Sequence, residues 1–334
     1  MKNHYVELTA LDTVTLQTTE SSPTAGPGQA LLRTRYSVIS PGTELARLHG
    51  TILPGRNGKG ASFPMWTGSS IVAEVVESAD PGRLPVGARV VASRPHALYS
   101  TINLDDANGW ARIPEGVSDE EAGLAVFLKI GLTAALCVEV KFGHRVLILG
   151  QGLIGYCAAQ WFNCTPAVEV IAADLPETRL SFARERGVDA RPTAEAVALA
   201  QTRPFDIVIE ATGVPAVVLE AFDYIREGGA VVLLGTPRGT LKDFDVTNLI
   251  HRHPAVVYGA HGGTHGMDVV GAPGLAIRNS LALCLDYIVH RRVRVDGLIG
   301  ATFAPSDAAK AYAAVAQRGV YTVGLDWGRE ELGG

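Results

Sequence analysis

Three patterns of hydrophobic and polar positions follow one another along the 334-residue chain. Up to about residue 115, apolar residues come in short alternating or β-branched runs separated by glycine and proline, which predicts a β-rich region. From about 120 to 265, runs that are apolar throughout alternate with helical segments, as is typical of a parallel sheet covered by helices on both faces. The remaining residues are mixed, with a predicted helix near 275–291 and a last strand near "YTVGLDW".

The middle region carries the clearest secondary-structure signal. Its predicted helices include "PETRLSFARERG" and "AVVLEAFDYIREG". The predicted strands are residues 144–150, 168–174, 205–211, 229–235 and 255–260. Strands and helices that alternate in this way predict a doubly wound α/β domain.

Composition narrows the class of protein. A net charge of −5 gives no reason to expect a nucleic-acid partner. No apolar run approaches the roughly 20 residues of a membrane helix, and the N-terminus lacks a signal-peptide core, so we expect a cytoplasmic protein without membrane attachment. The four cysteines form no C-x-x-C pair, which favours buried thiols over a disulfide framework or a structural zinc site.

The strongest motif is "VLILGQGLIG", in which Gly150, Gly152 and Gly155 form a G-x-G-x-x-G between an apolar strand and a helix. In this context the glycines permit a tight turn, a close approach of the backbone to a pyrophosphate, and close helix–strand packing. The helix N-terminus attracts the phosphate charge. The motif therefore predicts a dinucleotide site.

The end of the next strand indicates which dinucleotide binds. Asp174 lies about twenty residues beyond the glycines, where a carboxylate accepts hydrogen bonds from the ribose hydroxyls and repels a 2′-phosphate. This favours NAD over NADP. Arg179, five residues later, is the main feature that would suit NADP instead.

The succession of "FPMWTGSSIVAEVVES", "VGARV", "IPEGVSDEEAG", the glycine motif and "DIVIEATG" resembles the medium-chain dehydrogenase/reductase superfamily over nearly the whole chain. The resemblance implies a GroES-like β-rich catalytic domain and a doubly wound Rossmann domain with a parallel sheet. The implied boundaries are 1–118 and 267–334 for the two parts of the catalytic domain and 119–266 for the Rossmann domain. It also implies a homodimer formed through the Rossmann sheets.

Many members of that superfamily carry a catalytic zinc, and here the expected donors are replaced. Ser40 and Pro41 stand where the first ligand, a cysteine, is expected, and Gly68-Ser69-Ser70 replaces a G-H-E triplet. The four-cysteine structural zinc loop is also missing. Hydroxyls are poor zinc ligands beside thiolate and imidazole, so we expect no metal. The "ISPGTE" segment is similar to the zinc-free branch that includes bacteriochlorophyllide hydroxyethyl dehydrogenase.

Without zinc, a positioned acid or base must manage the proton of the alcohol. Thr43 matches the family position that starts a proton relay, although it could equally cap the following helix. Lys129 lies in an apolar helix that approaches the nicotinamide in the family, with Glu44 as a candidate partner, and a lysine that reaches the surface is the alternative. His96 titrates in a useful range but could be an exposed loop residue.

The resemblance extends to a set of cofactor contacts and to residues around the pocket. Arg94, Trp66 and Tyr99 are expected near the substrate, and His251 near the mouth of its pocket. His251, His253, His261 and His265 are not expected to bind a metal. The predicted cofactor residues are Gly150, Gly152, Leu153, Ile154, Gly155, Asp174, Arg179, Thr212, Gly235, Thr236 and His261.

These features predict a zinc-independent, NAD(H)-dependent oxidoreductase that acts on a secondary alcohol or its ketone as a small-molecule substrate, in specialised metabolism. Three other functions stay open. The chain could be an NADPH-dependent enoyl or quinone reductase, although Asp174 argues against NADPH. It could use NAD for a non-redox epimerisation or elimination, or bind NAD without catalysis.

Overall fold

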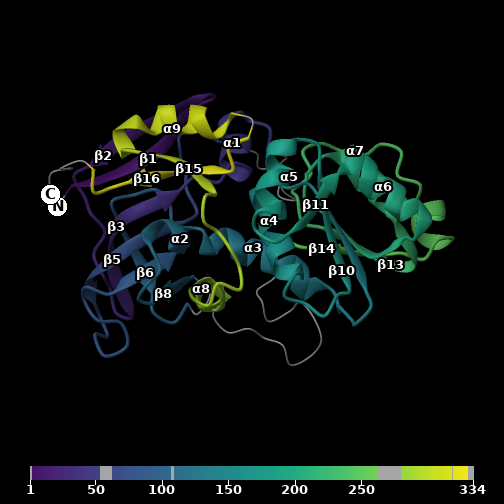
Figure 1. Cartoon of the computed structure of the whole chain (residues 1–334). Coiled ribbons are helices and arrows are strands. Elements are labelled where there is room, and N and C mark those ends of the chain that lie inside the picture. The colour runs from purple at the N-terminus through teal and green to yellow at the C-terminus, as the bar shows by residue number, and fades with distance from the viewer. Residues whose placement is uncertain (1, 53–61, 107–108, 262–279, 318, 330–334) are drawn as a thin grey trace. The chain divides into compact units, whose positions relative to one another are not determined.

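The computed structural model describes residues 2–52, 62–106, 109–261, 280–317 and 319–329. The chain forms two compact units, one of Met1–Val126 with Arg278–Gly334 and the other of Phe127–Ile277 (Figure 1). Both ends of the chain therefore belong to the first unit, and the second is inserted between them. No helix among the described residues is long and apolar enough to cross a membrane.

The first unit is built on two sheets. The smaller has the order β2-β1-β4, and the larger runs β15-β16-β3-β5-β6-β8 with β7 paired to β3. The strands are β1 (Asn3–Ala10), β2 (Thr13–Thr19), β3 (Gln29–Val38), β4 (Met65–Trp66), β5 (Ile71–Ser78), β6 (Arg89–Ala92), β7 (Tyr99–Asn103), β8 (Trp110–Arg112), β15 (Ile299–Phe303) and β16 (Thr322–Asp326). Its helices are α1 (Thr43–Leu48), α2 (Asp119–Gly123), α8 (Ser280–Val289), η2 (Pro305–Asp307) and α9 (Ala308–Val315).

The alternation seen in the sequence explains how this unit is held together. In β1, Val6 and Leu8 lie two residues apart on one face and are fully buried in a core that also includes Tyr312 and Trp327. Tyr312 comes from α9 near the end of the chain, so this core joins both ends. Burial of a large aliphatic side chain contributes about 1.5–3 kcal/mol.

The second unit is a six-stranded parallel sheet with the order β11-β10-β9-β12-β13-β14. Its strands are β9 (Arg145–Leu149), β10 (Glu169–Asp174), β11 (Asp189–Pro192), β12 (Phe205–Glu210), β13 (Ile225–Leu233) and β14 (Val256–Gly259). Its helices are α4 (Leu153–Phe162), α5 (Glu177–Arg184), α6 (Thr193–Thr202), α7 (Pro215–Tyr224) and η1 (Thr247–His251), and α3 (Ala125–Cys137) begins at the unit boundary. The predicted doubly wound parallel sheet is thus present.

Four details differ from the sequence-based expectation. The sequence pattern did not reveal β11, a short strand with a single buried residue. The segment "IREG" belongs to β13 and not to the preceding helix, because α7 ends at Tyr224. The first boundary between the two units lies at 126/127, whereas 118/119 was predicted. The difference arises because α2 packs with the first unit, where the Glu121 carboxylate accepts a hydrogen bond from Arg291. The second lies at 277/278, in a stretch outside the described residues.

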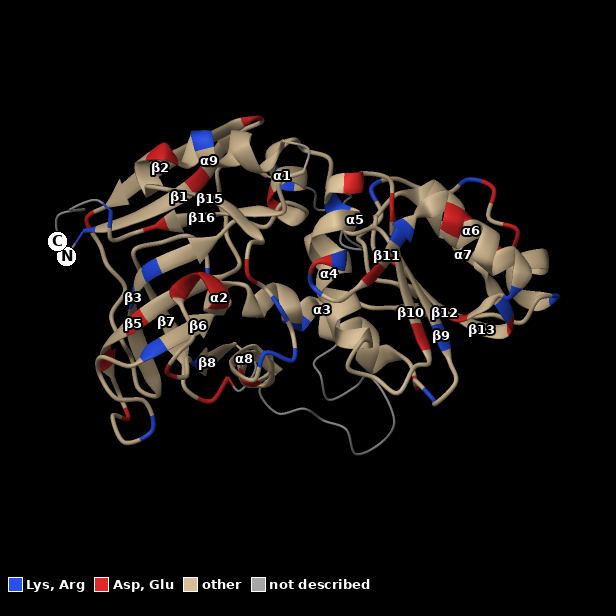
Figure 2. Ribbon diagram, in the orientation of Figure 1, with Lys and Arg blue, Asp and Glu red and all other residues tan. Residues whose placement is uncertain are grey.

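Acidic and basic residues are interspersed within each unit, and the first turn of α2 is the clearest exception (Figure 2). That turn contains Asp119, Glu120 and Glu121, and Ser118 and Glu121 form a capping box at its start. Carboxylates at a helix N-terminus are stabilised by the helix dipole, so local helix energetics explain this acidic cluster.

Candidate functional site

The glycine motif forms a close-packed turn between β9 and α4. A Cβ on Gly155 would lie 1.8 Å from the carbonyl oxygen of Gly150, and one on Gly150 would lie 2.8 Å from Cγ2 of Thr212. Gly150 also has a φ of +92°, a conformation that L side chains rarely adopt. Gly152 is the N-cap of α4 and supplies no side-chain cap. The first backbone N–H groups of the ten-residue helix can therefore receive an anion.

Beside this turn, the first two residues of α4 differ in how deeply they are buried. Leu153 is buried and belongs to the core of the second unit, whereas Ile154 is half-buried. Of the two, only Ile154 has substantial surface left for contact with a ligand.

Asp174, at the end of β10, is hydrogen-bonded to the glycine turn. Its Oδ2 accepts a hydrogen bond of 2.8 Å from the backbone N–H of Gln151, and its Oδ1 accepts one of 2.7 Å from Leu175 N–H. Arg179 Nη1 lies 3.4 Å from the same Oδ2. Each carboxylate oxygen can accept more than one hydrogen bond, so Asp174 retains capacity for two ribose hydroxyls. The structure thus brings both predicted specificity residues, Asp174 and Arg179, to one place.

A third segment reaches this edge of the sheet from β12 and β13. A Cβ on Gly213 would lie 2.6 Å from the carbonyl oxygen of Thr236, and one on Gly235 would lie 2.5 Å from Gly213 N. Thr212 and Gly235, which were predicted to contact the cofactor, therefore lie beside the glycine turn, and Thr236 is exposed next to them. The segments meet at the carboxyl ends of β9 and β12, where the connections diverge to opposite sides, which is where open α/β sheets bind ligands.

Sequence reasoning missed Glu210, the last residue of β12. Its side chain is fully buried and accepts hydrogen bonds from Thr212 N–H at 2.7 Å and Gly213 N–H at 3.1 Å. Burial raises its pKa, although the hydrogen bonds from Thr212 and Gly213 oppose that shift. Glu210 fixes the turn that packs against Gly150. The available signal was an acidic residue at the end of the apolar run "FDIVIEA".

In the first unit, the structure brings together two of the predicted catalytic residues, Glu44 and His96. Both are buried, and His96 Nε2 lies 3.1 Å from Glu44 Oε2. The same oxygen accepts hydrogen bonds from Thr67 Oγ1 at 3.0 Å and from the hydroxyl of Tyr312. Glu44 Oε1 accepts one of 2.7 Å from Ser40 N–H. His96 is therefore not an exposed loop residue.

Charge and hydrogen bonding decide the ionisation of this cluster. Burial raises the pKa of Glu44, but the imidazole of His96 and the hydrogen bonds from His96, Tyr312 and Ser40 outweigh burial, so its pKa is lowered. Burial and the carboxylate of Glu44 hold the pKa of Tyr312 well above its usual value. Glu44 is thus a carboxylate and Tyr312 a neutral donor. Sequence reasoning missed Tyr312, because it lies 268 residues from Glu44.

Thr43 is exposed at the first position of α1, and Gly42 is the N-cap without a side-chain cap. The capping alternative for Thr43 is therefore wrong. Lys129 lies half-buried on α3 in the second unit. Among the described residues, by contrast, the hydrogen-bond partners of the Glu44 carboxylate come from the first unit.

The remaining predicted residues are scattered. His261 is exposed after β14, His251 lies in η1 and His265 lies outside the described residues. Arg94 donates to the carbonyl oxygens of Ser93 and Thr101, so its guanidinium is held by backbone. Trp66 is about half exposed and stacks on Tyr5 with ring centroids 4.4 Å apart.

The residues at the expected zinc-ligand positions do not fit a metal. Ser70 is fully buried and donates to the carbonyl oxygen of Gly123 at 2.6 Å. Ser40 and Ser69 offer only hydroxyls, which bind zinc poorly. In the described part of the chain, no group of three or more His, Cys, Asp or Glu side chains is arranged to hold a metal ion.

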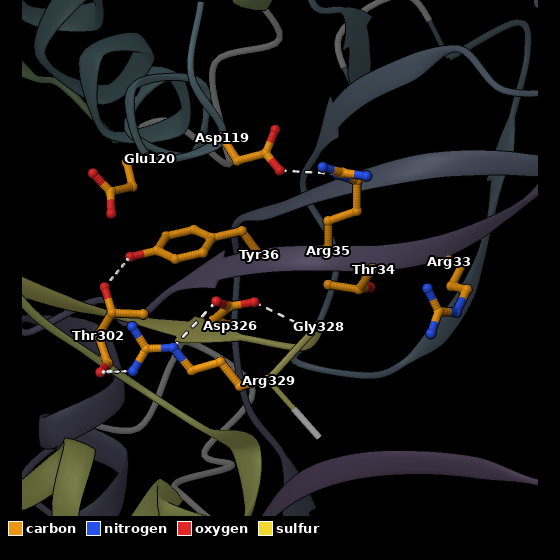
Figure 3. Close-up of a pocket in the computed structure, with 10 residues that line it drawn as sticks. All are labelled: Arg33, Thr34, Arg35, Tyr36, Asp119, Glu120, Thr302, Asp326, Gly328 and Arg329. Atoms are coloured by element: carbon orange, nitrogen blue, oxygen red, sulfur yellow. Dashed lines mark hydrogen bonds and ion pairs between the residues drawn. The ribbon is translucent and has the colours of Figure 1, made fainter. Parts of the chain in front are cut away.

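A surface pocket of about 360 Å³ in the first unit is lined by none of the predicted site residues (Figure 3). Its buried wall is Tyr36, whose hydroxyl lies 2.8 Å from Thr302 Oγ1. Burial raises the pKa of Tyr36 to about 12, so this phenol remains protonated at physiological pH. Arg35 and Arg329 at the rim are paired with Asp119 and Asp326.

Comparison with known proteins identifies similar sequences and folds. Residues 154–272 match the family model described as zinc-binding dehydrogenase. The chain is 30% identical over 211 residues to a "probable zinc-binding alcohol dehydrogenase" of Mycobacterium tuberculosis, an alignment that covers 62% of this chain and 51% of that protein. The chain thus spans about half the length of this curated relative.

Two solved structures share the fold across almost the whole chain. A structure from Sinorhizobium meliloti 1021 bound to NADP has a TM-score of 0.79 at 19% identity, covering 98% of this chain and 99% of that one. A structure from Escherichia coli CFT073 described as a short chain alcohol dehydrogenase complexed with NADH has a TM-score of 0.79 at 16% identity, with the same coverage.

Proposed function

We propose that the chain is an oxidoreductase of the medium-chain dehydrogenase/reductase superfamily that binds NAD(H) and interconverts a secondary alcohol and its ketone, and its similarity to zinc-binding dehydrogenases supports this proposal. The observation that carries this proposal is the cradle formed by Gly150, Gly152 and Gly155 with Asp174 hydrogen-bonded beside it. A side chain at Gly155 would collide with the turn, and the carboxylate keeps acceptor capacity for a ribose.

The residues of the second unit fit a nicotinamide dinucleotide. The start of α4 would bind the pyrophosphate, Asp174 the adenosine ribose, and the segments at Thr212 and Thr236 the nicotinamide half. When bound, the nicotinamide supplies a carbon that accepts or donates hydride. Asp174 supports NAD(H) over NADP(H), although its pairing with Arg179 reduces the charge that a 2′-phosphate would meet.

We propose that the reaction is independent of zinc, since serines stand at the expected ligand positions. Removal of the alcohol proton then depends on side chains. Thr43 carries an exposed hydroxyl without a hydrogen bond to the described residues, and Lys129 carries an amine on a largely buried helix. We propose that both groups take part in the removal of that proton.

The edge strand β14 supports the proposed homodimer. Among the described residues β14 lies at the edge of its sheet, its Val256 and Val257 are 47% and 40% exposed, and an edge strand can pair with a strand of a second chain. Light scattering on the protein as it elutes from a size-exclusion column should therefore give about twice the chain mass of 35.2 kDa. A mass of one chain would contradict the dimer.

The activity is tested by adding NAD⁺ or NADP⁺ with a panel of secondary alcohols, and NADH or NADPH with the matching ketones and with enones, and following absorbance at 340 nm. Zinc is quantified in the same samples before and after dialysis against a chelator. We expect turnover of an alcohol–ketone pair that chelation does not change. Reduction of enones alone would identify an enoyl reductase instead, and about one zinc per chain after dialysis would refute zinc independence.

A further inference from the structure

Two segments of the first unit carry hydroxyl groups at the proposed site. Ser40 and Thr43 lie on residues 38–44, and Ser69 lies on residues 67–70. Their hydroxyls form no hydrogen bond within the described part of the chain. The segments continue the paired ends of β3 and β5, since Val38 N–H donates to the carbonyl oxygen of Ser70 at 3.1 Å. Beyond that pair, the sheet ladder no longer holds them together.

A buried cluster joins the segments instead, and we define it as Glu44, Thr67, His96 and Tyr312. Glu44 binds the backbone of Ser40 through Oε1 and the side chains of the other three members through Oε2. The backbone N–H of His96 also donates a hydrogen bond of 2.8 Å to the carbonyl oxygen of Thr67. One carboxylate therefore links both hydroxyl-bearing segments to a loop and to helix α9.

Burial makes this link rigid. The four members are at most 2% exposed, so removal of one donor would leave a buried carboxylate short of a partner. The backbone leaves little free space, because a Cβ on Gly68 would lie 2.4 Å from His96 N. His96 Nδ1 is buried without a hydrogen bond to any described residue, so the side-chain polar contact of this imidazole is made through Nε2 to Glu44.

We propose that the Glu44 cluster is a positioning device that holds the segments 38–44 and 67–70 in register and so sets where Ser40, Thr43 and Ser69 present their hydroxyls to the substrate oxygen. The proposal rests on the proposed function, because it places the substrate oxygen at these segments. Glu44, His96 and Tyr312 act through the segments and do not themselves touch the substrate. In metal-containing relatives, ligands on both segments would bind one metal ion and so link the segments. Here the Glu44 cluster provides that link.

A merely stabilising cluster would predict something different. It would contribute to the melting temperature in the same way as any buried hydrogen bond of the unit, with no selective effect on the two segments. The chain offers a matched comparison, because Tyr36 is also a buried tyrosine of the first unit whose hydroxyl is hydrogen-bonded, to Thr302. Tyr312→Phe and Tyr36→Phe each remove one phenolic hydroxyl at constant ring volume.

The experiment measures amide hydrogen exchange in the full-length wild type and both variants, together with NADH affinity by calorimetry and turnover. We expect Tyr312→Phe to speed exchange in residues 38–44 and 67–70 by about tenfold, because hydrogen bonds to charged groups are among the stronger ones. It should lower turnover by at least about tenfold and leave NADH affinity within about twofold. Tyr36→Phe should change neither exchange in these segments nor turnover.

Equal effects of both variants on exchange in the two segments would overturn the proposal. So would faster exchange in Tyr312→Phe with wild-type turnover. If Tyr312→Phe fails to fold, Thr67→Val, which removes one donor to Glu44 and keeps the side-chain shape, provides the same test. If the wild type binds no NADH, the proposed function fails, whereas the exchange data still report whether the cluster orders the segments.

Discussion

Substitution of Gly155 by alanine tests the packing on which the cofactor cradle depends. The new Cβ would lie 1.8 Å from the carbonyl oxygen of Gly150 and 2.9 Å from its carbonyl carbon. Both atoms belong to the backbone, so no flexible side chain can move away. Overpacking of a core typically costs 1–3 kcal/mol, and because the contact is with backbone, we expect about 3 kcal/mol for Gly155→Ala.

This magnitude is measurable as a shift of the melting temperature. For a unit of roughly 150 residues, each kcal/mol lowers the midpoint by about 2–4 °C, which gives a decrease of about 6–12 °C. The turn must move to accept the new methyl group, so NADH affinity should fall at least about tenfold, or about 1.4 kcal/mol.

The assay is thermal unfolding followed by circular dichroism, combined with a calorimetric titration of NADH. Gly259→Ala is the matched control, because this glycine lies in β14 of the same unit and a Cβ there would meet no atom of the described residues within 4 Å. We expect the control to keep the wild-type midpoint and affinity. A Gly155→Ala protein that melts within about 2 °C of the wild type and binds NADH normally would refute the packing argument.

Three further predictions concern charge and proton transfer. Asp174→Ala should weaken NADH binding more than NADPH binding and so narrow the preference for NADH, as measured by calorimetry. An unchanged ratio of the two dissociation constants would contradict the role of the carboxylate. Lys129→Met and Thr43→Val should each lower single-turnover hydride transfer at least about tenfold. The Thr43 variant should keep the wild-type melting temperature, since Gly42 and not Thr43 is the N-cap of α1, and normal hydride transfer in both would exclude these groups. The lowered pKa of Glu44 means that its stabilising contribution is complete above its unfolded pKa of about 4.5 and is lost as the pH falls through the folded value. Glu44→Gln should therefore flatten the acid side of the stability–pH curve, and an unchanged acid limb in chemical denaturation would contradict this assignment.

The sequence predicted the second unit well because its signals are local. The apolar runs that became β9 and β12 bury nearly every residue, and β10 buries a continuous run of three, so their hydrophobic pattern is continuous. The glycines mark a turn whose constraints are steric and act within six residues. Asp174 follows its strand at a fixed distance from that turn, so both halves of the cradle could be located without coordinates.

The cluster in the first unit could not be predicted in the same way. Glu44 and Tyr312 meet only because both ends of the chain share one core, and no local pattern indicates a contact across 268 residues. Lys129 suggested a partner for Glu44 by its charge alone, whereas the carboxylate is bound by Ser40, Thr67, His96 and Tyr312. Thr43 carries a good capping side chain at the wrong position, because α1 begins one residue earlier than the sequence suggested.

The most direct test of the account is a pair of calorimetric titrations of the full-length wild-type protein, one with NADH and one with NADPH, under identical salt and pH. The cradle of Gly150, Gly152 and Gly155 beside Asp174 predicts that NADH binds at one site per chain and at least about tenfold more tightly than NADPH, a difference of about 1.4 kcal/mol. Tighter binding of NADPH would show that Arg179 and not Asp174 determines the specificity, and the absence of binding by either dinucleotide would contradict the proposed oxidoreductase.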